Sequence, residues 1–242
     1  MSIIVNHLYH VYGMDTSQPV KALDDVSFEI NEGDFAVIAG SNGSGKTVLM
    51  TLIARLDALT QGQIDVQEGY DAGLVFQDAD SQILGMSPWE DVLFGAKHSG
   101  LKKEDAQRIT EQALRETGLW EKKDLNARTL SGGEKRRLAV AGILAVNRKL
   151  IIFDEPFANL DWPGVKQVLS IMQKLKDEKK TVIVLTHEIE KVLAMSNRFI
   201  ILDKGKIQFD GNAEEGLKLP LEEYGIKNPL NSYQSLKDLL WS

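Results

Sequence analysis

The sequence predicts an α/β fold, and two kinds of segment support that prediction. Short apolar runs stand between turn signals, without the polar alternation of strands that have one face in water. Stretches with helical spacing of apolar residues lie between several of these runs. Strands buried on both faces and alternating with helices are typical of a parallel sheet between helical layers. The predicted strands are 35–39, 74–76, 150–153, 182–185 and 199–202.

The helical pattern is clearest in residues 104–117 and 134–146, and the segment from about 86 to 148 is typical of an inserted helical subdomain. Residues 3–12 and 22–30 indicate edge strands on either side of a loop. They predict a small antiparallel β layer beside the main sheet. We expect one domain over residues 1–212. Residues 213–242 are expected to form a tail that packs on this domain or on a second subunit.

Composition narrows the classes of function. The 242 residues suffice for a full hydrophobic core, and the lack of cysteine excludes disulfide frameworks and thiol catalysis. A net charge of −7 repels polyanions, so any phosphate ligand must bind at a local positive site. We expect no nucleic acid partner. Neither a secretion signal nor an apolar run of roughly 18 residues is present, which favours a cytoplasmic location.

A glycine-rich segment follows the predicted strand 35–39 and precedes an apolar stretch able to form a helix. Its pattern, G-x-x-x-x-G-K-T, occurs in the strand, loop and helix order that a phosphate-binding P-loop requires. Glycines let backbone N–H groups converge on a phosphate, and the helix start adds its positive dipole end. A flexible glycine turn is the alternative. The predicted nucleotide-binding residues are Gly40, Ser41, Asn42, Gly43, Ser44, Gly45, Lys46, Thr47 and Val48.

Two carboxylates end the apolar run 150–153. Asp154 is placed to bind Mg²⁺ through water, and Glu155 to orient or deprotonate the water that attacks a γ phosphate. Lys46 would reach the β and γ phosphates, and the Thr47 hydroxyl would bind Mg²⁺. Alone, an acidic pair after a strand is more often a helix cap or part of a solvated loop. With the glycine-rich loop, the pair predicts a P-loop NTPase (RecA-like) core.

The segment Leu130-Ser131-Gly132-Gly133-Glu134 opens the predicted helix 134–146. Ser131 and Glu134 have the spacing of a capping box, in which each side chain bonds a backbone N–H at the helix start. The two glycines also leave that helix start open to an anion. The capping role and an anion-binding role are compatible, and we expect both.

The chain resembles the nucleotide-binding subunits of ATP-binding cassette (ABC) transporters over about residues 3–212. Residues 40–47 match the Walker A motif, 150–155 the Walker B motif and 130–134 the LSGGQ signature. Gln77 matches the Q loop, residues 158–161 the D loop and His187 the switch histidine. Residues 73–82 and 90–95 look most like the ATPases of energy-coupling factor (ECF) transporters, which import vitamins, cobalt or nickel.

The resemblance implies a division of the site between two subunits. In that family two cassettes hold ATP between them, each P-loop facing the signature of the other. Ser131 and Gly133 would therefore act across a dimer interface, and Gly132 and Asp161 are also implied to bind the nucleotide. Glu134 replaces the usual glutamine of the signature, and the capping geometry is expected to turn its charge away from the nucleotide.

The resemblance also assigns roles around the nucleotide, with ATP and Mg²⁺ as cofactors. Tyr12 is similar in position to the aromatic residue that stacks on adenine, and Tyr9 is the competing choice. The implied catalytic residues are Glu155, His187 and Gln77. The implied metal-binding residues are Thr47, Gln77 and Asp154.

The implied function is that of an ATPase subunit that powers an ECF-type importer from the cytoplasmic face of the membrane. The implied partners are a second ATPase subunit (identical or paralogous), a transmembrane scaffold protein and a solute-binding membrane subunit. Residues 78–94 combine carboxylates with apolar side chains, and they would form a groove for cytoplasmic helices of the scaffold. The alternatives are a soluble ABC ATPase that acts on a cytosolic assembly and a nucleotide-dependent module that hardly hydrolyses.

Overall fold

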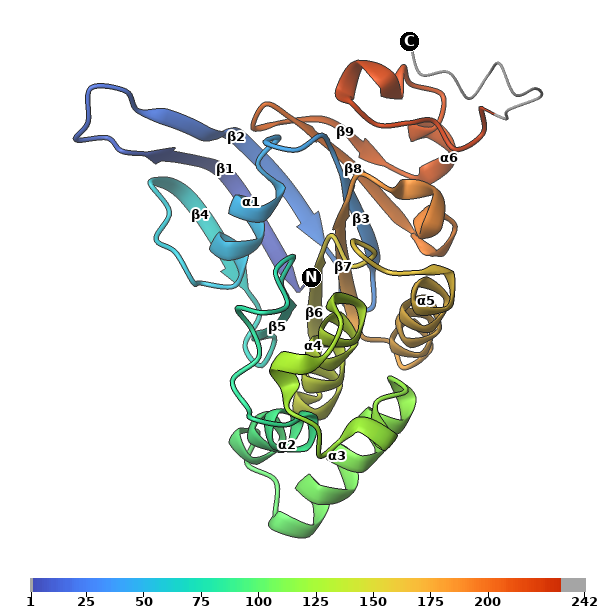
Figure 1. Cartoon of the computed structure of the whole chain (residues 1–242). Coiled ribbons are helices and arrows are strands. Elements are labelled where there is room, and N and C mark those ends of the chain that lie inside the picture. The colour runs from blue at the N-terminus through green and yellow to red at the C-terminus, as the bar shows by residue number, and fades with distance from the viewer. Residues whose placement is uncertain (1, 232–242) are drawn as a thin grey trace.

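Two β-sheets and a set of helices make up the fold (Figure 1). The computed structural model describes residues 2–231. The main sheet has six strands in the order β5-β6-β7-β3-β8-β9, and the second sheet has three in the order β2-β1-β4. The strands are β1 (Ile3–Tyr12), β2 (Val20–Ile30), β3 (Phe35–Ala39), β4 (Gln61–Val66), β5 (Ala72–Val75), β6 (Leu150–Asp154), β7 (Thr181–Thr186), β8 (Arg198–Asp203) and β9 (Lys206–Gly211). The helices are α1 (Lys46–Ile53), α2 (Pro88–His98), α3 (Lys103–Glu116), α4 (Gly132–Val146), α5 (Trp162–Asp177) and α6 (Ala213–Gly216).

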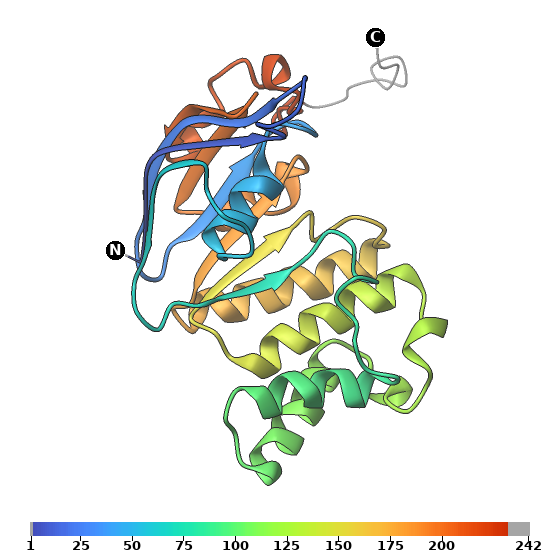
Figure 2. The same ribbon diagram turned by 90° about the vertical axis from the view of Figure 1, so that its left-hand side faces the viewer.

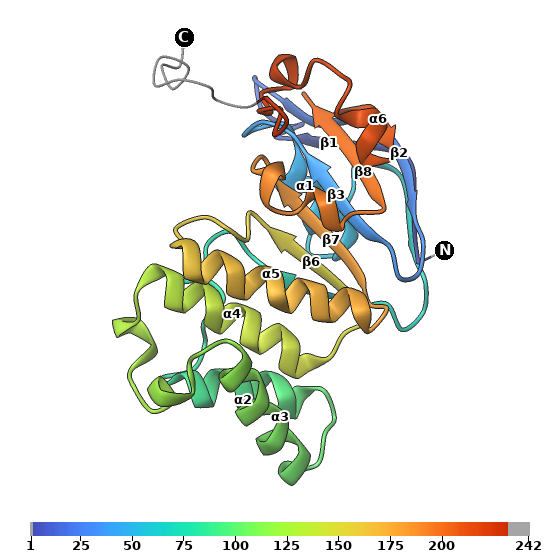
Figure 3. The same ribbon diagram turned by 90° about the vertical axis from the view of Figure 1, so that its right-hand side faces the viewer.

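The main sheet is buried on both faces, which confirms the two-sided burial predicted from its apolar strands. Side chains alternate between the faces of a strand. In β3, Phe35 and Val37 belong to the core cluster that contains α5, whereas Ala36 and Ile38 belong to the cluster that contains α1, β1 and β2. Figure 3 shows α4 and α5 on one side of this sheet and α1 on the other. All neighbouring pairs are parallel except β8 and β9.

The antiparallel layer is present, but one of its strands was placed wrongly. The sequence predicted edge strands for residues 3–12 and 22–30, whereas β1 is the middle strand, paired with β2 on one side and β4 on the other. The chain returns after α1 as β4, which runs along the free side of β1.

The helices α2, α3 and α4 enclose a third apolar cluster at the end of the molecule opposite the antiparallel sheet (Figure 2). α4 belongs to two clusters: Leu138 and Ala141 pack among these helices, and Ala139 and Val140 pack against the main sheet. The helix thus connects the helical layer to the sheet. The boundaries of a subdomain at 86–148 and of a domain at 1–212 remain predictions.

Residues beyond β9 fold back onto the main sheet. Leu221, in a short 3₁₀ turn (Leu221–Tyr224), and Ile226 are buried in the cluster that contains α5. The spacing of Leu236, Leu239 and Leu240 predicts an amphipathic helix at the end of the tail, and these residues lie outside the described residues. Among residues 2–231, no helix has both the length and the apolar character needed to cross a membrane.

Candidate functional site

The glycine-rich loop joins β3 to α1, in the order the sequence predicted. A Cβ atom on Gly40 would lie 2.2 Å from the Leu202 carbonyl oxygen. Gly45 has a φ of 107°, and a Cβ there would lie 2.8 Å from the Ala22 carbonyl oxygen. Only glycine fits these two positions. No side chain caps the start of α1, so its first backbone N–H groups remain available to an anion.

A cavity of about 380 Å³ opens beside this loop. It brings together residues from the loop, from the hairpin between β1 and β2, and from the ends of β5 and β6. Tyr12 is on its wall and partly exposed, whereas Tyr9 does not line it. The lining residues are Tyr12, Val20, Lys21, Ala22, Asn42, Gly43, Gly45, Lys46, Thr47, Val48, Gln77 and Glu155.

Lys46 supplies the positive charge of the cavity. Its side chain is only 5% exposed, and its ammonium donates to the carbonyl oxygens of Gly40 (2.7 Å) and Ser41 (3.0 Å). The ammonium also lies 3.7 Å from Glu155 Oε1. Burial lowers the pKa of Lys46, and the carboxylates of Glu155 and Asp154 oppose that shift. An ammonium held by two loop carbonyls can exchange them for phosphate oxygens without leaving the loop.

Asp154 and Thr47 form the polar pair at the bottom of the site. Thr47 Oγ1 donates to Asp154 Oδ2 at 2.9 Å, while Asp154 Oδ1 is buried and accepts no hydrogen bond from the described residues. A hydroxyl and a carboxylate are oxygen ligands of the kind that Mg²⁺ prefers, and Mg²⁺ is commonly held by one or two carboxylates plus phosphates. The residues present therefore fit a Mg²⁺ ion bound together with a nucleotide.

The same carboxylate lowers the stability of the nucleotide-free protein. Burial raises the pKa of Asp154, and the nearby Glu155 carboxylate adds to that effect while the Thr47 hydrogen bond opposes it. An acid whose pKa is raised by folding makes the folded state less stable above that pKa than below it. The one oxygen of this buried carboxylate that lacks a hydrogen-bond partner among the described residues, Oδ1, is available to a ligand.

We expect Asp154→Asn to raise the melting temperature of the protein at pH 7 in the absence of Mg²⁺ and nucleotide. Removal of the buried charge gains on the order of 1 kcal/mol, or roughly 2–4 °C for a chain of this length. The gain should shrink as the pH falls through the pKa of Asp154, because the wild-type side chain then becomes neutral as well. Differential scanning calorimetry measures both effects. Asp177→Asn, at an exposed carboxylate on α5, is the control, and a lower melting temperature for Asp154→Asn alone would contradict the prediction.

Glu155 and His187 contact each other at the carboxyl ends of β6 and β7. Glu155 Oε1 lies 2.9 Å from His187 Nδ1, and Glu155 Oε2 accepts a 3.0 Å hydrogen bond from Thr186 Oγ1. The glutamate is almost fully buried and has a φ of 46°, in the left-handed region that residues other than glycine rarely occupy. Its carboxylate is therefore held in one orientation, with the half-exposed histidine between it and solvent.

The signature residues lie elsewhere in the same chain. Ser131 and Glu134 form the predicted capping box at the start of α4. Glu134 also bonds Lys122, and hydrogen bonds from Lys122 and from the Ser131 backbone lower its pKa. The carboxylate thus turns back onto its own helix, as expected. Gly133 packs beside Leu160 of the D loop, and none of these residues lines the cavity.

The predicted site residues therefore fall into three groups. The largest group lines the cavity. Four more residues do not line the cavity but bond residues that do: Gly40 and Ser41 bond Lys46, Asp154 bonds Thr47, and His187 bonds Glu155. The residues that lie outside the cavity are Ser44, Ser131, Gly132, Gly133 and Asp161. Asp161 accepts a hydrogen bond from Gly164 N and caps α5.

Two contacts of the site were not predicted. The Gln82 side chain accepts from Phe76 N (3.1 Å) and donates to the Leu74 carbonyl (2.8 Å), so it ties the segment that follows Gln77 to the carboxyl end of β5. At Gly225, a Cβ would lie 2.8 Å from Ser41 Cβ, so the chain beyond β9 packs against the glycine-rich loop. Gln82 is the last residue of the segment 73–82 that resembles ECF ATPases, but the sequence assigned no role to it or to Gly225.

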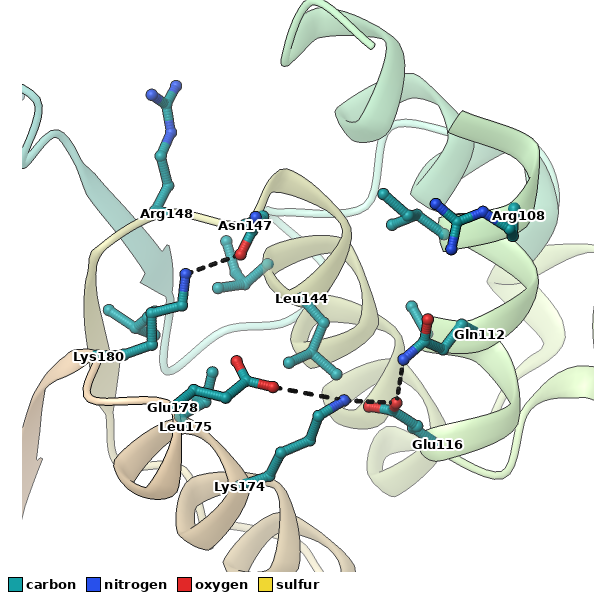
Figure 4. Close-up of a pocket in the computed structure, with 14 residues that line it drawn as sticks. Arg108, Gln112, Glu116, Leu144, Asn147, Arg148, Lys174, Leu175, Glu178 and Lys180 are labelled. Atoms are coloured by element: carbon teal, nitrogen blue, oxygen red, sulfur yellow. Dashed lines mark hydrogen bonds and ion pairs between the residues drawn. The ribbon is translucent and has the colours of Figure 1, made fainter. Parts of the chain in front are cut away.

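A second cavity, of about 240 Å³, lies between α3, α4 and α5 near the amino ends of β6 and β7 (Figure 4). Its charged groups are paired: Lys174 bonds Glu116, which also accepts from Gln112, and Lys180 bonds Asn147. The cavity is at the end of the sheet opposite the glycine-rich loop.

Comparisons with known proteins agree with this geometry. Residues 23–158, more than half of the chain, match the family model described as ABC transporter. This chain belongs to the ABC transporter family. The ABC chain is 39% identical to the energy-coupling factor transporter ATP-binding protein EcfA1 of Caldanaerobacter subterraneus, over 85% of this chain and 78% of that protein.

Solved structures give the same result for the fold of this ABC protein. It is similar to cbiO1 from Clostridium perfringens, part of the ABC transporter complex cbiONQ, with a TM-score of 0.77, 29% identity and coverage of 89% and 90% of the two chains. A dimeric ATP-binding cassette in a post-hydrolysis state, bound to ADP and Pi, has a TM-score of 0.79 and 26% identity, with coverage of 87% of this chain and 98% of that one. The P-loop NTPase fold and the ATPase class of this ABC protein follow from these matches.

Proposed function

We propose that this ABC ATPase is a subunit of an ECF-type importer and that ATP-driven closure of a pair of cassettes powers the transport of a vitamin or transition metal. One observation supports the ATPase part above all. A glycine-rich loop, a buried lysine and a glutamate held by a histidine meet at one cavity, and a carboxylate with a free oxygen bonds Thr47 on its wall. The similarity to ECF ATP-binding proteins over most of the chain supports the transporter type.

In this proposal, each side chain has a separate task in hydrolysis. The loop N–H groups and Lys46 bind the triphosphate, with Tyr12 as the platform for adenine. Mg²⁺ held at Thr47 and Asp154 would neutralise charge that develops on the transferred phosphoryl group. Glu155 accepts a proton from the attacking water or orients it, and His187 holds the carboxylate and reaches the γ phosphate. Gln77, on the same wall, completes the water site.

The signature and D-loop residues support a two-subunit site. Ser131, Gly132 and Gly133 form an accessible helix start, away from the cavity of their own chain. A second cassette, identical or paralogous, would receive its ATP there, because a helix N-terminus with free N–H groups attracts phosphate. The similar cassette bound to ADP and Pi is a dimer, in agreement with this arrangement.

The surface proposed to contact a transmembrane scaffold includes a cavity of about 660 Å³. Leu84 and Met86 are strongly exposed on its wall. Glu90 and Asp91, two of the carboxylates within residues 78–94, accept backbone hydrogen bonds from residues 84–86 and so hold the loop before α2. The exposed carboxylates next to Gln77 are Asp78 and Asp80, of which Asp80 also pairs with Lys135 of α4. A solute-binding membrane subunit would complete the importer on the cytoplasmic face.

We expect charge reversal at Asp78 and Asp80 to separate the chain from its membrane partner. Like charges placed together at an interface cost several kcal/mol, so the amount of scaffold that co-purifies with Asp78→Lys/Asp80→Lys should fall by roughly tenfold or more. ATP affinity should stay within about twofold, because neither carboxylate lines the nucleotide cavity. Asp105→Lys, on the exposed face of α3, is the control for added charge.

Co-purification from solubilised membranes also tests the function itself. The proposal predicts a transmembrane scaffold protein and a small membrane subunit together with the tagged wild-type chain, and ATP-dependent solute uptake by the complex in vesicles. Recovery of the chain in a soluble cytosolic assembly, without membrane subunits, would instead support the soluble ABC ATPase alternative.

A further inference from the structure

A buried arginine connects three parts of the site. Arg136 lies in the second turn of α4 and is 3% exposed. One guanidinium nitrogen donates to the carbonyl oxygens of Phe76 (3.2 Å), Glu155 (3.1 Å) and Asp154 (3.5 Å). The other donates to the carbonyl oxygen of Gln77 at 2.5 Å. The side chain thus spans the segment that follows β5 and the segment that follows β6.

The topology explains why one side chain can reach both segments. β5 and β6 are parallel neighbours, with Val75 opposite Phe153, so the residues that follow them lie side by side at the same edge of the sheet. Phe76, Gln77 and Glu155 lie just beyond the ends of these strands, so Arg136 can reach their carbonyl groups. A guanidinium presents several N–H donors in one plane and can satisfy carbonyls from two segments, whereas an ammonium is a single point donor.

The electrostatics of the position are balanced. Burial lowers the pKa of Arg136, and the carboxylates of Asp154, Asp78 and Glu155 oppose that effect. A guanidinium keeps its proton in such surroundings. A permanently charged donor in a site of low polarity holds the carbonyls more strongly than a neutral donor does.

The backbone of Glu155 needs this support. Its φ of 46° costs energy for a residue with a Cβ, and such a conformation persists only where the surroundings enforce it. On one side Glu155 N donates to the Leu185 carbonyl at 2.9 Å, and on the other Arg136 bonds the Glu155 carbonyl. The peptide is therefore fixed at both ends, and the direction of the carboxylate follows from it.

We infer that Arg136 is a positioning residue for ATP hydrolysis, which fixes the Gln77 and Glu155 peptides in register with each other and with the helix that begins at Ser131. The inference rests on the proposed ATPase role of Glu155. Arg136 itself does not line the nucleotide cavity, so it acts through Gln77 and Glu155 and not on the phosphates. Its loss should therefore lower kcat and leave ATP affinity almost unchanged.

The test compares Arg136→Met and Arg136→Lys with Arg137→Met. Each variant is made in the full-length chain and purified in complex with its partners. Arg137 is a matched control because it bonds the Thr117 carbonyl and the Gln167 side chain, far from Gln77 and Glu155. Titration with a fluorescent ATP analogue without Mg²⁺ gives the number of folded binding sites and the Kd. The value of kcat is then expressed per binding site. Loss of folded protein therefore does not lower the measured kcat.

We expect Arg136→Met to lower kcat per site on the order of 10- to 100-fold, because small displacements of catalytic groups have effects of this size. Its Kd for ATP should stay within about threefold of the wild-type value. The kcat of Arg136→Lys should lie between those of the wild type and Arg136→Met, because lysine keeps the charge but lacks the planar set of donors of a guanidinium. Arg137→Met should keep kcat within about twofold. Equal kcat per site for Arg136→Met and Arg137→Met would overturn the inference, as would a fall in ATP affinity with unchanged kcat.

A failure of the proposed function would look different. If Arg136 has no positioning role, the wild-type protein still hydrolyses ATP and Glu155→Gln still blocks hydrolysis. If the wild-type complex and the Glu155→Gln complex have the same turnover, the ATPase role of Glu155 fails first, and the positioning role fails with it.

Discussion

Replacement of Glu155 by glutamine is expected to lower ATP turnover by roughly 10²- to 10⁴-fold, the usual contribution of a general base. The amide keeps the shape of the side chain and can still accept from Thr186, but it has no basic oxygen to take a proton from water. ATP should bind about as tightly as before, because Lys46 and the loop N–H groups are unchanged. Stopped-flow single-turnover measurements separate these two quantities.

Glu116→Gln makes the same chemical change in the second cavity, where the carboxylate bonds Lys174 and Gln112 (Figure 4). Turnover of that variant should stay within about twofold of wild type, because the cavity lies at the opposite end of the sheet. With Mg-ATP, the Glu155→Gln protein should also accumulate as cassette pairs in gel filtration. Normal turnover by Glu155→Gln would show that another group activates the water.

Replacement of Lys46 by methionine is expected to have the largest effect on ATP affinity. Methionine has a similar volume and suits the buried position, but it removes the charged hydrogen bond to the phosphates. Such a bond contributes about 1.5–3 kcal/mol, or roughly 10- to 150-fold in Kd. Isothermal titration of the variant with Mg-ATP measures the change.

Lys174→Met is the matched control, because Lys174 is a partly buried lysine that is ion-paired with Glu116 outside the nucleotide site. Its Kd for ATP should equal that of the wild type. If Lys46→Met and Lys174→Met bind ATP equally well, the phosphates do not occupy the glycine-rich loop.

The sequence predicted correctly those strands whose pattern of apolar residues matches the burial of their side chains in the fold. β3 and β6 are apolar at every position except the final Asp154, so burial on two faces could be inferred from residue type alone. The edge position expected for β1 was wrong because the neighbour that covers it, β4, is the polar segment QGQIDV, which has no strand pattern of its own. Pairing with β1, and not the amphipathicity of β4, makes that segment a strand.

In the site, too, the local features were predicted and the features that depend on tertiary packing were not. Glycine spacing and the capping box are local features, and the structure places the loop and the helix start as the motifs require. The three basic residues after Glu134 look alike in the sequence, yet their surroundings differ. Lys135 pairs with Asp80, Arg136 is buried under the catalytic segments, and Arg137 bonds α5. Only the packing of α4 against two layers separates these roles.

The central claim is that the glycine-rich loop of one chain and the signature of a second chain bind the same nucleotide. A structure of the Glu155→Gln protein with Mg-ATP tests this claim most directly. We predict the triphosphate in the loop, with Lys46 moved from the Gly40 and Ser41 carbonyls onto phosphate oxygens. The start of a neighbouring cassette's signature helix should face the γ phosphate. A nucleotide bound elsewhere, or bound in the loop with every signature helix directed into solvent, would contradict the proposal.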